Sequence, residues 1–353
     1  MSLMLGEPAP WFTAATPSNP EFALDTAGGR FVLLCFLPPA PEARVPAMRA
    51  VAARQALFDD ARACVFFVVP QAHPAGARDL RGLRWFLDED GAVARLYGAL
   101  EPDGSARPQW VLLDPSMRVL SIAPIERAEA VIDQVAALPA PGDHAGVALH
   151  APALVVPRVF EPELCAQLIA LHEADGGAFT GVMRDIDGRT VAVMDEAKSR
   201  RDIWIHDEAR QGTLRGALER RLFPMLQRAF QFEAAGIERY LVSRYAAEEG
   251  GVFRAHRDNT TRGTAHRRFA CTINLNDDYE GGDLRFPEFG PGLHRAPVGG
   301  AVVFSCSLLH EVTPLTRGWR YAFLPFFYDA AGAGVLADYR ATLTAGDASR
   351  DQA

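Results

Sequence analysis

Residues 299–327, GGAVVFSCSLLHEVTPLTRGWRYAFLPFF, contain two apolar runs separated by a polar segment with Pro and Gly. The first run ends at His310, and the second contains Arg320 among aromatic and aliphatic neighbours. Runs rich in β-branched and aromatic residues, bounded by turn formers, are typical of strands. The stretch therefore predicts two successive strands that carry one imidazole and one guanidinium.

The same pattern of short apolar runs, split by Gly, Asn, Asp and Pro, begins near residue 237. Helical patterns precede it at 161–175 and 213–230, and Pro224 interrupts the second one. Helices followed by short antiparallel strands are typical of a jelly roll, or double-stranded β-helix, with flanking helices. We predict this fold for residues 154–332.

A histidine and an aspartate stand two residues apart in GGVFRAHRDNTTRG, residues 250–263. If FRAHRD is a strand or a strand end, His256 and Asp258 point to the same face. Such a pair alone is weak evidence, but His310 adds a second imidazole. Two histidines and one carboxylate on a β-barrel form the facial triad of non-haem Fe(II) oxygenases, which leaves three coordination positions open.

Arg320 indicates what fills two of those positions. A guanidinium among apolar neighbours is costly unless it is paired. Its planar fork fits a carboxylate bound through two hydrogen bonds. The distal carboxylate of 2-oxoglutarate meets this requirement.

The region resembles the prolyl 4-hydroxylase-like branch of the Fe(II)/2-oxoglutarate dioxygenases. The resemblance lies in the order H-x-D, His, Arg and in RYAAEEGGVFRAHRDN, CTINLNDDYEGGDLRFPEFG and APVGGAVVFSCSLLHEVTPLTRGWRYAF. It implies that His256, Asp258 and His310 ligate iron, that Arg320 holds the C5 carboxylate of 2-oxoglutarate, and that Tyr245 hydrogen-bonds the cosubstrate. It implies Fe(II), 2-oxoglutarate and O₂, with ascorbate as an optional reductant, and no catalytic residue apart from the ligands.

Residues 1–138 alternate predicted strands and helices, as in α/β proteins. Strands are predicted at 30–37 and 63–70, a helix at 42–61, a hairpin at 110–124 and a helix at 127–138. Both strands are continuous apolar runs, which is typical of strands covered on both faces. An Ala-, Pro- and Gly-rich linker is expected at 139–153, and a C-terminal tail at 333–353.

The first region resembles the thioredoxin fold and, more narrowly, a peroxiredoxin. The resemblance lies in GEPAPWF (6–12), FVLLCFLPPAP (31–41) and RPQWVLLDPSMRVL (107–120). Counting from Pro38, the family's positions for Thr or Ser and for the peroxidatic cysteine hold Glu42 and Val45. Because a thiolate is what attacks peroxide, we expect a thioredoxin-like domain without redox activity.

The bulk composition excludes several classes of protein. The formal net charge of −8 argues against nucleic acid as a partner, and no apolar run is long enough to span a membrane. The start lacks a secretory signal, and the five cysteines form no C-x-x-C pair, so we expect a cytoplasmic protein.

The substrate stays open between prolyl residues in a protein, free amino acids and natural-product scaffolds. Residues 178–206 are polar and are expected to form a loop-rich lid. Arginines cluster around the H-x-D pair, and a solvated surface or an anionic or peptide-carbonyl substrate face would each explain them: Arg254, Arg257, Arg262, Arg267 and Arg268. His266 is a candidate substrate contact.

Two other functions remain as alternatives. The first domain could reduce the iron site through thiols, although its cysteine pattern speaks against this. The chain could also be a non-catalytic protein that binds partners through its first domain. In the main interpretation, we expect that domain to serve recruitment or homodimer formation.

Overall fold

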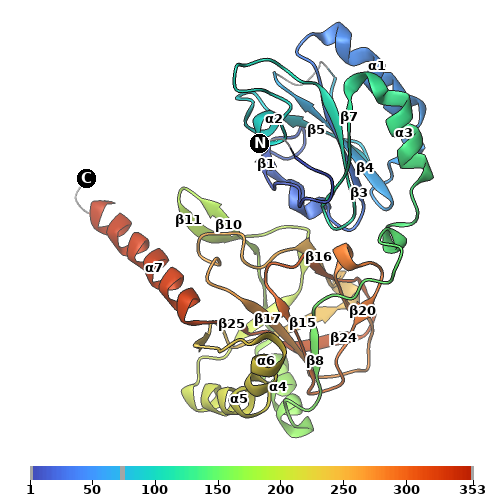
Figure 1. Cartoon of the computed structure of the whole chain (residues 1–353). Coiled ribbons are helices and arrows are strands. Elements are labelled where there is room, and N and C mark those ends of the chain that lie inside the picture. Colours follow the sequence, from blue (N-terminus) through green and yellow to red (C-terminus); the bar gives the residue numbers. More distant parts are fainter. Residues whose placement is uncertain (1–2, 72–75, 351–353) are drawn as a thin grey trace. The chain divides into compact units, whose positions relative to one another are not determined.

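The computed structural model describes residues 3–71 and 76–350 of the chain. It divides into two compact units, one of residues 1–150 with 286–292 and one of residues 151–285 with 293–353. Figure 1 shows the elements of both units. Within the described part of the chain, no helix combines the length and the hydropathy that a membrane crossing requires.

The first unit is built on a five-stranded sheet in the order β5-β4-β3-β6-β7. The strands are β3 (Phe31–Phe36), β4 (Ala63–Val69), β5 (Leu83–Leu87), β6 (Gln109–Leu113) and β7 (Val119–Pro124). β3, β4 and β5 run parallel, whereas β6 and β7 are antiparallel to their neighbours. Every residue of β3, β4 and β6 is buried, as expected for continuous apolar runs with both faces covered.

Each face of this sheet has its own core. Helices α1 (Pro41–Ala53) and α3 (Ala128–Ala137) pack on the face that contains Phe31 and Leu33. The short helix α2 (Ala92–Leu96) packs through Val93 on the other face. The smaller strands β1 (Thr13–Ala14) and β2 (Phe22–Ala23) form a separate hairpin.

The helix predicted at 42–61 is shorter than expected, because α1 ends at Ala53. Asp59 accepts hydrogen bonds from the backbone N–H groups of Ala61 and Arg62, at 2.9 and 2.7 Å. Such bonds from a side chain to its neighbouring backbone compete with helix formation. They fix a turn immediately before β4.

The second unit is β-rich, and two of its sheets build the site. The larger sheet has the order β14-β25-β17-β24-β15-β13-β9, with β21 and β8 attached through β17, and the smaller has the order β12-β16-β22-β19-β20. The strands of the larger sheet are β8 (Leu154–Val156), β9 (Ala178–Phe179), β13 (Arg201–Trp204), β14 (Gly236–Ile237), β15 (Leu241–Ala246), β17 (Phe269–Asn274), β21 (Ala301–Ser305), β24 (Trp319–Phe323) and β25 (Phe326–Tyr328). Those of the smaller are β12 (Lys198–Ser199), β16 (Val252–His256), β19 (Leu284–Arg285), β20 (Leu293–His294) and β22 (His310–Val312). A further pair is formed by β18 (Glu280–Gly281) and β23 (Leu315–Arg317).

Three helices cover the outer face of the larger sheet (Figure 1): α4 (Pro162–Asp175), α5 (Glu208–Arg221) and α6 (Phe223–Phe230). Leu168 of α4 and Leu218 of α5 share one core with Ile273 and Phe323 of the sheet. The helix predicted at 213–230 is two helices, because Pro224 lies in the first turn of α6, where its missing N–H costs nothing.

One expectation about this unit is wrong. The segment 178–206, expected as a loop-rich lid, contains five strands, and β10 (Val182–Ile186) pairs with β11 (Arg189–Val193) as a hairpin. Polar residues alternate there with Val, Ile and Met, which suits a solvent-facing hairpin. Helix α7 (Ala330–Arg350), favoured by its many alanines, runs through the described part of the expected C-terminal tail.

Candidate metal centre

Two histidines meet across one strand pair. His256 ends β16, His310 begins β22, and the two residues are register partners in the antiparallel ladder. Asp258 follows two residues later, where its backbone N–H donates to the carbonyl of Cys306 at 2.9 Å. This bond fixes the turn that brings the carboxylate back towards the imidazoles.

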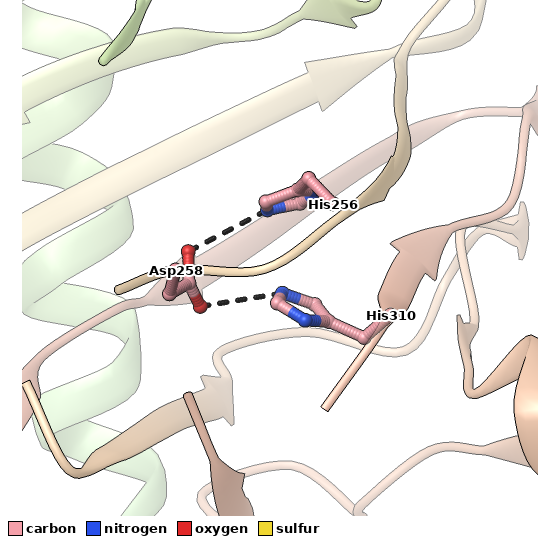
Figure 2. Close-up of side chains that lie close together, drawn as sticks. All are labelled: His256, Asp258 and His310. Atoms are coloured by element: carbon pink, nitrogen blue, oxygen red, sulfur yellow. Dashed lines mark ion pairs between the residues drawn. The ribbon is translucent and has the colours of Figure 1, made fainter. Parts of the chain in front are cut away.

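The three side chains converge (Figure 2). The Nε2 atom of His256 lies 3.5 Å from Oδ1 of Asp258, and Nε2 of His310 lies 3.3 Å from Oδ2. One ligand atom from each residue lies within 4.8 Å of the others. This is the donor set that the sequence predicts for a facial triad.

Hydrogen bonds orient both imidazoles. Nδ1 of His256 lies 2.7 Å from the carbonyl oxygen of Arg254, and Nδ1 of His310 lies 3.0 Å from that of Leu308. Because a carbonyl only accepts, each Nδ1 carries a proton, and each ring directs its Nε2 towards the carboxylate. Two imidazole Nε2 atoms directed at one carboxylate form a donor set that fits a divalent metal.

The ionisation of the cluster suits the same role. Burial lowers the pKa of His256, and the neighbouring His310 lowers it further. Burial alone would raise the pKa of Asp258, but the two imidazoles outweigh burial and hold that pKa well below its usual range. Both shifts favour the deprotonated forms of His256 and Asp258, which are the forms that bind a metal.

Apolar side chains surround the cluster. The ring of Phe253 stacks on His256 with centroids 3.6 Å apart, and the ring of Phe304 lies 4.6 Å from that of His310. These contacts restrict the imidazole rotamers and keep water from one side of the centre.

Arg320 lies in the same cavity as the three side chains. Only 3% of the residue is exposed. Its Nη2 donates to Oγ1 of Thr272 at 2.9 Å and to Oδ1 of Asn274 at 3.2 Å, whereas its Nε and Nη1 are buried with no hydrogen-bond partner. Since a buried, half-satisfied guanidinium is unfavourable, the cavity fits an anion at this point.

Tyr245 pairs with Arg320 across β15 and β24, and its ring lies 5.3 Å from the guanidinium carbon. Its hydroxyl accepts a hydrogen bond from Nη1 of Arg200 at 3.3 Å. Arg200 also lines the cavity and forms an ion pair with Asp202 at 3.0 Å. This pair was not predicted from the sequence, because Arg200 lies between β12 and β13 in a segment that is polar throughout.

Part of the arginine cluster around the H-x-D pair is structural. Arg257 and Arg267 are buried, which corrects the solvated-surface interpretation for these two. Arg257 donates to the carbonyl of Ser307 at 2.5 Å, and Arg267 donates two hydrogen bonds to Glu238 at 2.5 and 2.6 Å. His266 lies 3.0 Å from the same Glu238 carboxylate and is not among the residues that line the cavity.

The two sheets bring a carboxylate and two histidines together, and a guanidinium without an acidic partner lies in the same cavity. This arrangement defines a metal-dependent oxygenase that uses an anionic cosubstrate. The family model of the 2OG-Fe(II) oxygenase superfamily matches residues 240–328, a range that contains every site residue predicted from the sequence. The C-terminal region carries this domain. The protein is an Fe(II)- and 2-oxoglutarate-dependent dioxygenase, which confirms the predicted activity and the predicted Fe(II), 2-oxoglutarate and O₂.

Similar proteins include two bacterial enzymes named PKHD-type hydroxylase. The one from Paracoccus denitrificans (strain Pd 1222) is 29% identical over 182 residues, which is 48% of this chain and 74% of that protein. The one from Phenylobacterium zucineum (strain HLK1) is 28% identical over 180 residues, which is 47% of this chain and 74% of that protein. Among solved structures, a Pseudomonas putida prolyl-4-hydroxylase matches with 19% identity and a TM-score of 0.36, over 56% of this chain and 97% of its own.

Proposed function

We propose that His256, Asp258 and His310 ligate Fe(II) and that Arg320 binds the C5 carboxylate of 2-oxoglutarate. The observation that carries this proposal is the shared cavity, with two Nε2 lone pairs and a carboxylate at one place and two unpartnered guanidinium donors at another. Tyr245, beside Arg320, orients the cosubstrate through its hydroxyl. A double-stranded β-helix that holds the site between its two sheets is the fold we propose for residues 154–332.

Bound iron and 2-oxoglutarate supply the activation of O₂ that places one oxygen atom in a substrate C–H bond and releases succinate and CO₂. The protein supplies the geometry. Arg320 fixes one end of the cosubstrate, and Phe304 and Val312 keep water from the centre. Asp258 occupies the third protein ligand position, which closes it to a halide and favours hydroxylation.

We propose an amino-acid or peptide substrate of the prolyl 4-hydroxylase-like kind. The similar bacterial proteins named PKHD-type hydroxylase support a hydroxylase of this branch. Ascorbate would serve as the external reductant that keeps the iron in its ferrous state.

For the first unit we propose a thioredoxin-like fold without redox activity. Its mixed sheet order and the helices on both faces support the fold. Cys35 is fully buried in β3, and burial raises the pKa of its thiol well above the usual range, which opposes thiolate chemistry. We propose boundaries at 1–138 for this domain and 139–153 for the linker, and a role in partner recruitment or homodimer formation, with neither nucleic acid nor membrane as partner.

The activity is tested by succinate formation from 2-oxoglutarate with Fe(II), O₂ and ascorbate. We expect slow uncoupled turnover by the wild-type protein and none by Asp258→Ala, with unchanged circular dichroism. The exposed Asp338→Asn variant is the matched control and should turn over like the wild type. Equal turnover by Asp258→Ala would contradict the ligand assignment.

A further inference from the structure

A second arginine of the cavity has no acidic partner. Arg239 lines the cavity together with the three proposed ligands, and its guanidinium carbon lies 4.2 Å from the centre of the Phe326 ring. Its Nε donates to the carbonyl of Leu324 at 3.0 Å. No described side chain accepts a hydrogen bond from its Nη1 or Nη2, so these groups are available to a ligand.

The acidic residues nearest to Arg239 are engaged elsewhere. Glu238 is bound by Arg267 through two hydrogen bonds. Asp202 accepts hydrogen bonds from Arg200 and from Ser243. Among the described residues, no carboxylate forms an ion pair with Arg239.

The charges that line the cavity balance except at this arginine. In the proposed function, Fe(II) and Arg320 together offset Asp258 and the two carboxylates of 2-oxoglutarate, and Asp202 offsets Arg200. Burial, together with the positive charges of Arg267 and Arg200, lowers the pKa of Arg239 to about 10, and the carboxylates of Glu238 and Asp202 only partly oppose this. Arg239 therefore remains protonated at neutral pH, in surroundings where an anion would stabilise its charge.

Arg239 and Arg320 reach the cavity from different segments, since Arg239 lies between β14 and β15 and Arg320 lies in β24. Arg239 precedes Tyr245, the register partner of Arg320, by six residues. The lining of the cavity thus contains Arg239 as well as Arg320 and the proposed iron ligands.

We infer that Arg239 binds a carboxylate of the substrate and that the substrate is a carboxylate-bearing amino acid or peptide-like molecule. The inference rests on the proposed function, because it assigns Arg320 to 2-oxoglutarate. A carboxylate held by the guanidinium, with Phe326 beneath it, would place the rest of the substrate along the cavity towards His256 and His310.

The test uses the full chain loaded with Mn(II) and 2-oxoglutarate under anaerobic conditions. Free and N-acetylated L-amino acids, each paired with its carboxamide, are screened for thermal stabilisation, and dissociation constants are measured for those that bind. We expect carboxylates to bind at least tenfold more tightly than their carboxamides. Arg239→Gln should lose this preference, Arg239→Lys should keep part of it, and the exposed Arg228→Gln should match the wild type.

Equal binding of acid and carboxamide, unchanged preference in Arg239→Gln, or no binding by any carboxylate would each overturn the inference. 2-Oxoglutarate binding is measured on the same proteins. If wild-type protein fails to bind 2-oxoglutarate, the proposed function fails; if it binds 2-oxoglutarate and only the panel fails, the inference about Arg239 alone is wrong.

Discussion

His256 and His310 face each other across the β16–β22 pair, and each donates its Nδ1 proton to the carbonyl of the residue two positions before it, Arg254 or Leu308. The ring centroids are 4.3 Å apart. The same local hydrogen bond thus sets both tautomers and turns both Nε2 atoms towards Asp258. The donor set is preorganised by the backbone, so little reorganisation is needed when a metal binds.

Removal of one imidazole should abolish tight metal binding. His310→Gln should lower the affinity for Mn(II) by at least ~100-fold, because loss of a direct ligand exceeds the 10–100-fold effect typical of outer-shell partners. The affinity is measured by electron paramagnetic resonance titration of free Mn(II). His206→Gln, at an exposed histidine, should bind as the wild type does; a similar loss in both variants would refute a specific role for His310.

Replacement of Arg320 should weaken 2-oxoglutarate binding and leave metal binding intact. Arg320→Gln removes charge-assisted hydrogen bonds of about 1.5–3 kcal/mol each, so the dissociation constant should rise by ~10- to 100-fold or more. Arg320→Lys keeps the charge but loses the planar fork, so its dissociation constant should lie between those of the wild type and Arg320→Gln. Calorimetric titration of Mn(II)-loaded protein measures this, and equal affinities in all three proteins would rule out the assignment.

Glu238 should stabilise the second unit in a pH-dependent way. Burial would raise its pKa, but hydrogen bonds from His266 and Arg267 outweigh burial and lower the pKa from 4.5 to about 2. Because the folded-state pKa is depressed, the contribution is complete above pH 4.5 and is lost as the pH falls through 2. It should amount to about 3 kcal/mol at pH 7 and roughly 1 kcal/mol at pH 3.

Urea unfolding of wild type and Glu238→Gln at these two pH values measures the difference in the free energy of unfolding. Glu233→Gln, at an exposed glutamate nearby, provides the control and should change little at either pH. A stability gap that is as large at pH 3 as at pH 7 would show that the effect of Glu238 is not electrostatic.

The cysteines should be inert in the folded protein. All five are buried, and burial raises the pKa of the Cys64 thiol to about 12 and that of Cys165 to about 11. We expect no reaction with Ellman's reagent until denaturant is added, and then five thiols per chain. Peroxide consumption should be the same for wild type and Cys35→Ser; a decrease in the variant would indicate redox activity in the first unit.

The central strands of the first unit could be predicted, because a strand that is buried on both faces appears in the sequence as a continuous apolar run. β3 and β4 appear in the sequence as unbroken apolar runs, and both were predicted within one residue of their bounds. The hairpin β10–β11 escaped prediction because its residues are mostly half-buried or exposed, so its polar composition resembles that of a loop. Arg54, the residue that follows α1, carries no clear sequence signal for the end of the helix. The turn at Asp59, further along the chain, carries a stronger one.

The sequence by itself determined the residue types of the centre. An H-x-D pair, a later histidine and an arginine in an apolar strand can be recognised without coordinates, because metal and carboxylate chemistry restricts which side chains serve. Only the tertiary structure decided that His256 and His310 are register partners, that Arg320 retains two unpartnered donors, and that Arg239 shares their cavity. The physical reason is that strand register and the pairing of buried charges depend on contacts between residues far apart in the chain, which no local pattern records.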